Sequence, residues 1–282
     1  MPRFIPTASL PLCMQLVSNH AIVTGGAQGI GRSITEELMS FGASVVIADV
    51  NEEGANEVAE ELTETYDGKA LGVECDVTEE ESVQSMVDAT VEEFGEVGIL
   101  VNNAGAAGLA RTWEMDAEEW EQTIEVCLNG PFYGSKAVVN HMLENDIEGA
   151  IVNTSSLNYK AATDGLPHYS AAKAGVSQFT KVLAAEAGRY GIRVNAVAPG
   201  SIRTPLTEGN GLVDGKMGER FVDRTPLGRI GEPEDVAKVV AFLLSDYGYW
   251  VTGETICVDG GQHIRGLHSY WDTLDEMGMF DE

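Results

Sequence analysis

The sequence predicts a single α/β domain in which a doubly wound parallel β-sheet carries helices on both faces. Two observations predict it. Short apolar segments bounded by turn residues recur along the chain, and helical patterns lie between them. Segments of this length suit strands that are buried on both faces, as in a parallel sheet. The alternation of strand and helix is typical of right-handed βαβ units.

The expected strands lie at residues 21–24, 45–48, 99–102, 151–154, 194–198 and 256–258. Helices are expected between them, with apolar residues at helical spacing within 34–41 and 83–94. Thr78 precedes a run of glutamates, which suits a cap followed by acidic residues at the positive end of the helix dipole. Pro233, followed by two acidic residues, is typical of another helix start.

At 282 residues the chain is long enough for one large domain with a substantial core. The sequence contains no linker, internal repeat or low-complexity block. We expect the domain over residues 18–263, an N-terminal extension at 1–17 and a C-terminal tail at 264–282. Two interpretations of residues 1–13 stay open, a disordered extension and a mis-assigned start.

The charge balance is strongly acidic, with 45 acidic against 17 basic residues and a formal net charge of -28 at pH 7. A surface of this sign repels nucleic acid, so polynucleotide binding is disfavoured. High salt screens self-repulsion, since the Debye length falls to about 3 Å at 1 M. We expect a halophilic protein of a salt-rich cytoplasm, with a merely acidic protein as the alternative.

The sequence also predicts a cytoplasmic protein without a membrane anchor. No apolar run approaches the roughly 18 residues of a membrane span, and three prolines interrupt the first fourteen residues. The four cysteines are scattered and form no CxxC pair, so free thiols are expected. The five histidines lack metal-ligand spacing, and no metal site is predicted.

The first expected strand ends in a glycine-rich turn, TGGAQGIG at residues 24–31, which a helix follows. Glycines let a pyrophosphate approach the backbone amides, and the amino end of the helix offers N–H groups and a positive dipole. This strand–turn–helix context is what a nucleotide site requires. The expected cofactor contacts in this turn are Gly25, Gln28, Gly29, Ile30 and Gly31.

Asp49 ends the second expected strand, where a carboxylate can accept hydrogen bonds from the adenosine ribose. Because this carboxylate repels a 2′-phosphate, the sequence favours NAD over NADP; an ordinary turn aspartate is the alternative. Two competing classes share such a turn. A methyltransferase is one, and a phosphate-transfer loop is the other, although Arg32 stands where that loop needs lysine.

The strongest chemical motif is Tyr169-Ser-Ala-Ala-Lys173, whose spacing puts Tyr169 and Lys173 on one helix face. A neighbouring ammonium favours the phenolate, so Tyr169 can exchange a proton with an alcohol or alkoxide oxygen. Ser156 follows the expected strand at 151–154, and its hydroxyl can hold the same substrate oxygen. A lone YxxxK pattern is common by chance, so the surrounding motifs decide its meaning.

Together these motifs resemble the classical short-chain dehydrogenase/reductase family over about residues 18–262. The motifs occur in family order and spacing: residues 24–31, Asp76-Val77, Asn102 to Gly105, Ser156 with Tyr169 and Lys173, Pro199 to Thr204, and Val258 to Gly261. The resemblance implies a single-domain Rossmann fold. It also implies an NAD(H)-dependent oxidoreductase that interconverts a secondary alcohol and a ketone by hydride transfer, with Tyr169 as acid/base.

The resemblance assigns further roles by position. Lys173 is expected to hold the nicotinamide ribose, and Tyr169 also borders the cofactor. The other implied cofactor contacts are Asp76 and Val77 beside the adenine, Asn103, Ala104 and Gly105 along the cofactor, and Pro199, Gly200, Ile202 and Thr204 after the sixth expected strand. Helices near 117–144 and 169–189 commonly pair between subunits in this family, so a homodimer or homotetramer is expected.

Three functional alternatives stay open. A sugar 1-dehydrogenase and a 3-oxoacyl-acyl-carrier-protein reductase share these motifs, although Asp49 argues against the NADPH usual in the second. The third is an NAD-binding sensor that has lost turnover, because the family's usual Asn is Cys127 here. A thiol is a weak hydrogen-bonding group, and the nearby Asn129, two residues further along a helix, points about 200° away.

The substrate is a small molecule whose pocket we expect to be walled by Trp113, Tyr159, Leu206, Leu212 and Met217. Residues 205–225 fall where the family keeps a mobile loop, and their glycine-rich sequence suits a lid. His168 adjoins Tyr169, but a structural or solvent-facing role is favoured over a catalytic one.

Overall fold

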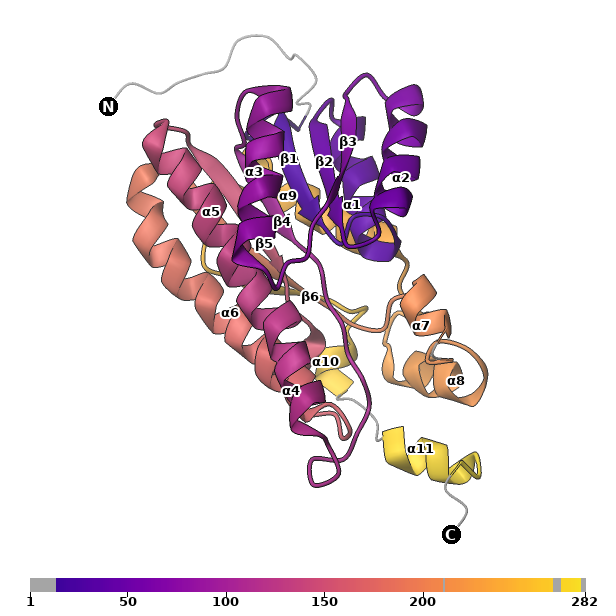
Figure 1. Ribbon diagram of the computed structural model, residues 1–282. Coiled ribbons are helices and arrows are strands. Elements are labelled where there is room, and N and C mark those ends of the chain that lie inside the picture. The colour runs from indigo at the N-terminus through magenta and orange to yellow at the C-terminus, as the bar shows by residue number, and fades with distance from the viewer. Residues whose placement is uncertain (1–13, 210, 266–269, 280–282) are drawn as a thin grey trace, which may run out of the picture.

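The computed structural model describes residues 14–209, 211–265 and 270–279, so the two interpretations of residues 1–13 lie outside the described residues. Within this part, one parallel sheet has the strand order β3-β2-β1-β4-β5-β6-β7 (Figure 1). The strands are β1 (His20–Thr24), β2 (Ser44–Asp49), β3 (Ala70–Glu74), β4 (Ile99–Asn102), β5 (Gly149–Thr154), β6 (Ile192–Pro199) and β7 (Thr255–Val258). The predicted doubly wound parallel sheet is confirmed.

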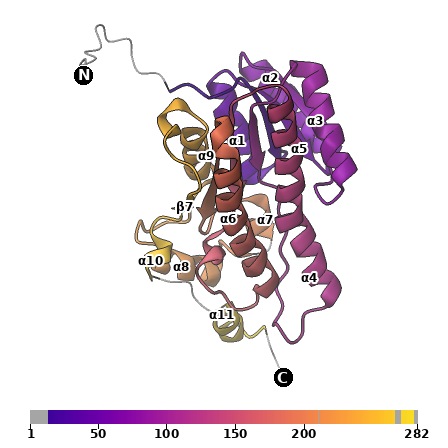
Figure 2. The same ribbon diagram turned by 90° about the vertical axis from the view of Figure 1, so that its left-hand side faces the viewer.

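Helices cover both faces of the sheet (Figure 2). The larger ones are α1 (Gly29–Ser40), α2 (Glu52–Thr65), α3 (Glu80–Phe94), α4 (Ala117–Ile124), α5 (Gly130–Glu144), α6 (Pro167–Ala187), α8 (Gly215–Arg224) and α9 (Pro233–Leu243). The shorter ones are α7 (Pro205–Gly209), α10 (Gln262–Arg265) and α11 (Tyr270–Glu276), and single turns include η1 (Glu125–Asn129) and η2 (Leu157–Tyr159).

Each face of the sheet has its own apolar core. Residues of α1, α2 and α9 pack on one face, and residues of α3, α5 and α6 pack on the other. The central strands are buried throughout, which explains their uninterrupted apolar sequences. None of the described helices is long and apolar enough to span a membrane.

The sequence predicted where two helices begin, and one of these two predictions is correct. Pro233 opens α9 as predicted, and Glu232 and Asp235 form a capping box around it. The prediction that Thr78 caps the next helix is wrong, because Glu79 occupies the N-cap position of α3. The Thr78 hydroxyl instead donates a hydrogen bond of 2.7 Å to the Asp76 carboxylate, which holds it outside the helix.

The strand order places a topological switch at β1, which pairs with β2 on one side and with β4 on the other. In open α/β sheets, ligands bind beyond the carboxyl ends of the strands at such a switch. The turn after β1 and the turn after β4 therefore meet at the position expected for a nucleotide.

His168 and Glu119 link the start of α6 to α4. The His168 side chain is fully buried, and its Nε2 lies 3.6 Å from Oε1 of Glu119. Neither ring nitrogen has a hydrogen-bond partner among the described residues. Burial lowers the pKa of His168 below its ordinary value, and the Glu119 charge opposes part of this shift. His168 is thus structural, one of the two roles that the sequence favoured.

The lowered pKa of His168 predicts a loss of stability in acid. Native His168 takes up a proton less readily than the unfolded chain, so its contribution is present above the ordinary pKa of 6.5 and is lost as pH falls. We expect His168→Gln to reduce the fall in unfolding free energy below that pH, measured by urea titration. Glu119→Gln should enlarge it. Equal pH dependence in all three proteins would contradict this assignment.

Candidate active site

The glycine-rich turn after β1 is held by the turn after β4. The Asn103 side chain donates hydrogen bonds of 3.1 Å to the carbonyls of Thr24 and Gly25, and its backbone N–H donates to Thr24 Oγ1 at 3.0 Å. Two glycines are required by close packing. A Cβ on Gly25 would lie 2.9 Å from the Ala104 Cα, and one on Gly31 would lie 2.1 Å from the Gly25 carbonyl oxygen.

The amino end of α1 fits a pyrophosphate. Its N-cap residue, Gln28, makes no side-chain capping bond, and no acidic residue lies in the first turn. By contrast, α2 and α3 each begin with two glutamates. Backbone N–H groups at such an end attract anions. In a chain this acidic, a helix whose first turn carries no acidic residue is suited to a negatively charged ligand at its amino end.

Asp49 lies at the end of β2, next to the same turn. One carboxylate oxygen accepts a hydrogen bond of 3.2 Å from the Ala27 N–H, and the other accepts one of 3.1 Å from the Asn51 N–H. Arg32 is directed to other partners. It forms ion pairs of 2.9 Å with Glu36 and 2.6 Å with Glu61. Arg32 therefore does not neutralise the negative charge of Asp49.

The residues expected beside the adenine follow β3. Val77 is buried, and a Cβ on Gly130 would lie 2.9 Å from its Cγ2 atom, so Val77 packs against the start of α5. Asp76 is exposed and accepts hydrogen bonds from Thr78. The two residues therefore face different surroundings, apolar for Val77 and solvent for Asp76.

The loop after β6 reaches the glycine-rich turn. A Cβ on Gly29 would lie 3.3 Å from Thr204 Cβ, which places these two predicted cofactor residues opposite each other. Gly200 donates a backbone hydrogen bond of 3.1 Å to Val258 at the end of β7. Ile202 is 4% exposed and forms a bridge with Gly231. Pro199 ends β6, so the predicted segment runs from the end of this strand to the glycine-rich turn.

Lys173 of α6 is buried to 2% exposure beside the end of β5. Its Nζ donates a hydrogen bond of 2.8 Å to the Thr154 carbonyl and lies 5.5 Å from the centre of the Tyr169 ring. The Ser155 hydroxyl donates a bond of 2.9 Å to the Lys173 carbonyl, which ties α6 to this strand end a second time. The ammonium therefore lies beneath the phenol, as the four-residue spacing predicts.

Ser156 follows β5 and is largely buried. Its Oγ accepts a hydrogen bond of 3.2 Å from the Asn158 N–H, which starts the short helix η2. Asn158 also reaches α6, since its Nδ2 donates to Ser170 Oγ at 3.4 Å. These bonds bring Ser156 to the start of α6, where Tyr169 lies.

Cys127 lies in η1, a π-helical turn between α4 and α5. Its buried Sγ contacts Ala106, donating to the carbonyl at 3.2 Å and accepting from the N–H at 3.4 Å. A Cβ on Gly105 would lie 3.7 Å from Lys173 Nζ and 3.8 Å from Cys127 Sγ, so the thiol lies near the ammonium. π-Helical turns occur frequently at functional sites.

The expectation about Asn129 assumed an α-helix. Residues 125–129 form a π-helix instead, so the angle of about 200° derived from α-helical geometry does not apply. The hydrogen bonds of Cys127 show directly where its side chain lies. They place its thiol, at the position of the family's Asn, on the backbone of the turn after β4.

Four of the five expected pocket residues divide into two groups, and the fifth, Tyr159, is partly buried at the end of η2. Met217 is buried in a small apolar cluster that includes Leu212. Trp113 and Leu206 are 80% and 54% exposed. Helix α11, whose Tyr270 packs against this cluster, was not predicted from the sequence. Apolar residues Tyr270 and Leu274 at helical spacing were the available signal.

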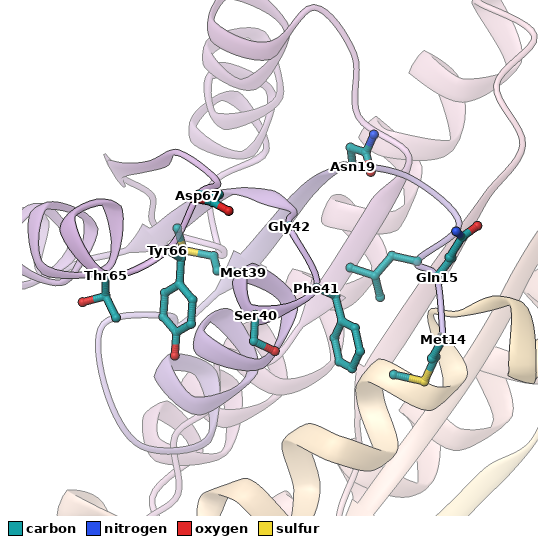
Figure 3. Close-up of a pocket in the computed structure, with 11 residues that line it drawn as sticks. Met14, Gln15, Asn19, Met39, Ser40, Phe41, Gly42, Thr65, Tyr66 and Asp67 are labelled. Carbon is teal, nitrogen blue, oxygen red and sulfur yellow. The ribbon is translucent and has the colours of Figure 1, made fainter. Parts of the chain in front are cut away.

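Two other features of the structure were not part of the site predicted from the sequence. A pocket of about 660 Å³ lies among Met14, Phe41 and Tyr66, near the amino ends of the strands (Figure 3). Among the described residues, the donor atoms of Cys257, Asp259 and His263 lie within 4.8 Å of one another.

The Cys257 group was not predicted from the sequence, which favoured no metal site. The Asp259 carboxylate already accepts hydrogen bonds from the backbone N–H groups of Gly261 and His263. Interaction with the neighbouring Cys257 side chain raises the pKa of Lys160. A cation would have to approach beside that ammonium, so the local charge opposes a metal ion.

Comparisons with known proteins agree with the site. A family model described as enoyl-(acyl carrier protein) reductase matches residues 25–263. The chain is 38% identical to glucose 1-dehydrogenase 2 of Bacillus subtilis, covering 88% of this chain and 96% of that protein. It is 39% identical to a 3-oxoacyl-acyl-carrier-protein reductase of Thermotoga maritima, with 88% and 99% covered.

Solved structures show the same likeness. A short-chain type dehydrogenase/reductase from Mycobacterium ulcerans has a TM-score of 0.88 at 31% identity, covering 93% of this chain and 96% of that one. A homologous structure from Mycobacterium marinum has a TM-score of 0.82 at 31% identity, with 88% and 96% covered. With its motifs in place on this fold, the chain belongs to the classical short-chain dehydrogenase/reductase family of oxidoreductases, which use a nicotinamide cofactor.

Proposed function

We propose that the protein is an NAD(H)-dependent oxidoreductase that interconverts a secondary alcohol and a ketone. The nicotinamide supplies or accepts the hydride. Tyr169 exchanges the proton of the substrate oxygen, and the Ser156 hydroxyl holds that oxygen in place. Lys173 lies beside Tyr169, where we expect it to hold the nicotinamide ribose. The observation that carries the proposal is the buried Lys173 Nζ, 5.5 Å from the Tyr169 ring centre.

Replacing Tyr169, the proposed acid/base, distinguishes an enzyme from an NAD-binding sensor. We expect wild-type protein to change absorbance at 340 nm with NAD+ and a secondary alcohol. Tyr169→Phe should lower kcat by about 10²–10⁴-fold because the proton acceptor is lost. Tyr190→Phe, at an exposed tyrosine beyond the end of α6, is the control and should retain activity. Binding of NAD+ without turnover on any substrate would support the sensor, with Cys127 as its first explanation.

The preference for NAD over NADP rests on the charge around Asp49. The carboxylate ends β2, and the first turn of α2 adds Glu52 and Glu53. Arg32, the nearby cation, is paired with Glu36 and Glu61. A 2′-phosphate would therefore meet several negative charges. One relative, L-rhamnose 1-dehydrogenase of Azotobacter vinelandii, is named for either cofactor, so the preference needs its own test.

Removing the Asp49 carboxylate should relax the cofactor preference. We expect Asp49→Ser to lower the ratio of kcat/KM for NAD+ over NADP+ by at least about tenfold, since hydrogen bonds to charged groups contribute about 1.5–3 kcal/mol. Glu57→Gln is the matched control because it removes one exposed carboxylate of α2 beyond its first turn. A wild-type preference for NADP+, or an equal effect of both variants, would contradict the proposed role of Asp49.

Two substrate classes are favoured by named relatives. Glucose 1-dehydrogenase 2 and L-rhamnose 1-dehydrogenase support a sugar substrate. The Thermotoga relative supports a 3-oxoacyl-acyl-carrier-protein reductase. The charge around Asp49 weighs against the NADPH usual in the second class. Sugar oxidation is therefore the favoured specific activity, and the broader alcohol/ketone interconversion does not depend on that choice.

We also propose a cytoplasmic homodimer or homotetramer adapted to high salt. Among the described residues, Cys75, Cys127 and Cys257 are free thiols, which suits a reducing compartment. The glutamates of α2 illustrate the surface charge, since all six are exposed: Glu52, Glu53, Glu57, Glu60, Glu61 and Glu64. Such groups repel one another unless salt screens them.

Screening predicts greater stability in concentrated KCl. We expect the unfolding free energy, from urea titration, to be several kcal/mol higher in about 2 M KCl than in about 0.1 M KCl, because the Debye length shortens from about 10 Å to a few Å. Sedimentation at both salt concentrations would give the oligomeric state. Equal stability in the two conditions would show that the acidic surface is not an adaptation to salt.

A further inference from the structure

The segment after β5 is attached to α6 by two hydrogen bonds from its side chains. The Ser155 hydroxyl donates one of 2.9 Å to the Lys173 carbonyl. One turn nearer the start of the helix, Asn158 Nδ2 donates one of 3.4 Å to Ser170 Oγ. Helix positions three residues apart are neighbours on one face, so this face of α6 lies against the segment that carries Ser156. Helix α6 also packs against η2, which Ser156 begins.

Within the described residues, both hydrogen bonds of the Ser156 hydroxyl are made with Asn158. The hydroxyl oxygen accepts the backbone N–H of Asn158 at 3.2 Å, and its proton is donated to the side-chain Oδ1 of Asn158, also at 3.2 Å. A serine hydroxyl has only one proton to donate. The backbone bond therefore fixes where the oxygen lies, and the side-chain bond fixes the direction of its proton.

The Asn158 amide is oriented in turn by α6. Its oxygen accepts the Ser156 proton, and its nitrogen donates to Ser170. Ser170 directly follows Tyr169 in the first turns of this helix. A half-buried asparagine thus joins the two parts of the chain that are proposed to act on the substrate oxygen. It contacts the Ser156 side chain directly and reaches the helical turn that carries Tyr169.

A substrate oxygen requires the same proton. A ketone oxygen only accepts hydrogen bonds, so Ser156 can hold it only by turning its proton away from Asn158 Oδ1. The bond from the Asn158 N–H uses a lone pair of the hydroxyl oxygen and can persist during this rotation. The oxygen then stays in place while its proton changes partner. Donors that are oriented beforehand stabilise developing charge without reorganisation during the reaction.

We propose, on the basis of the function proposed above, that Asn158 is a positioning residue for Ser156. It holds the hydroxyl beside the start of α6 and releases the hydroxyl proton to the substrate oxygen when substrate binds. Asn158 acts through Ser156 and does not touch the reacting atoms. This role differs from that of the family's usual Asn, whose position is taken by Cys127 in η1, on the backbone of the turn after β4.

The first test compares Asn158→Ala with wild type in the oxidation of a secondary alcohol by NAD+. We expect kcat to fall by about 3–15-fold, the effect of one lost hydrogen bond. KM should stay within about threefold, because an interaction that matters in the transition state lowers kcat and kcat/KM together. Asn19→Ala, at an exposed asparagine immediately before β1, is the matched control and should retain the wild-type kcat.

A double-mutant cycle distinguishes positioning of Ser156 from a general effect on the fold. Ser156→Ala alone should lower kcat by about 10²–10³-fold, as the loss of a preorganised donor does. Adding Asn158→Ala to it should lower kcat by less than about twofold more, because no hydroxyl is left to position. Ser170→Ala, which leaves Ser156 and Asn158 intact, should lower kcat about two- to fivefold in the wild-type background and should have no further effect in Ser156→Ala.

Circular dichroism and NAD+ titration should give the wild-type result for every variant, which shows that the fold and the nucleotide site are retained. An unchanged kcat in Asn158→Ala, or losses that multiply in the double variant, would overturn the proposal while hydride transfer by the wild-type protein stands. No turnover of any alcohol by the wild-type protein would overturn the proposed function, and this inference with it.

Discussion

The buried ammonium of Lys173 is the interaction on which the rest of the site depends. A buried charge is costly unless hydrogen bonds replace its water, and here the Thr154 carbonyl accepts one at 2.8 Å. That requirement fixes α6 against the end of β5. Once α6 is fixed, Tyr169 lies above the ammonium, and η2 carries Ser156 to the same place. The arrangement of the proposed catalytic residues therefore follows from satisfying one cation at the carboxyl end of a central strand.

Most of the fold could be predicted from the sequence because central parallel strands are buried on both faces. Five of the six predicted strands are short apolar segments for that reason, whereas the sixth, β7, is an edge strand that is only partly buried. The other edge strand, β3, was not predicted, because a glycine interrupts its apolar residues and an exposed glutamate ends it. The cap at Thr78 was misplaced by one residue, because a side-chain bond to Asp76 competes with capping. The spacing of apolar residues indicates which side chains are buried. It does not indicate where a local side-chain hydrogen bond competes with helix capping.

The candidate site, like the fold, could be predicted only in part from the sequence. The Tyr169–Lys173 pair could be predicted because both residues lie on one helix, where spacing determines direction. The contact of Cys127 with Ala106 and that of Tyr270 with Phe221 could not, because each joins segments far apart in the chain. The π-helical turn at Cys127 shows a further limit. An angle calculated for an α-helix fails where the backbone itself departs from α-helical geometry.

The acidity of the chain affects stability and cofactor binding at different distances. A net charge of -28 repels an anionic dinucleotide over many ångströms. Salt removes this repulsion, since the Debye length at 1 M is about 3 Å. The amino end of α1 acts at contact distance, through the N–H groups of a first turn that carries no acidic residue. Such contacts are screened much less than the distant charges. Concentrated salt would thus suppress the force that opposes both folding and the approach of a dinucleotide, and would largely spare the contacts proposed to hold its pyrophosphate.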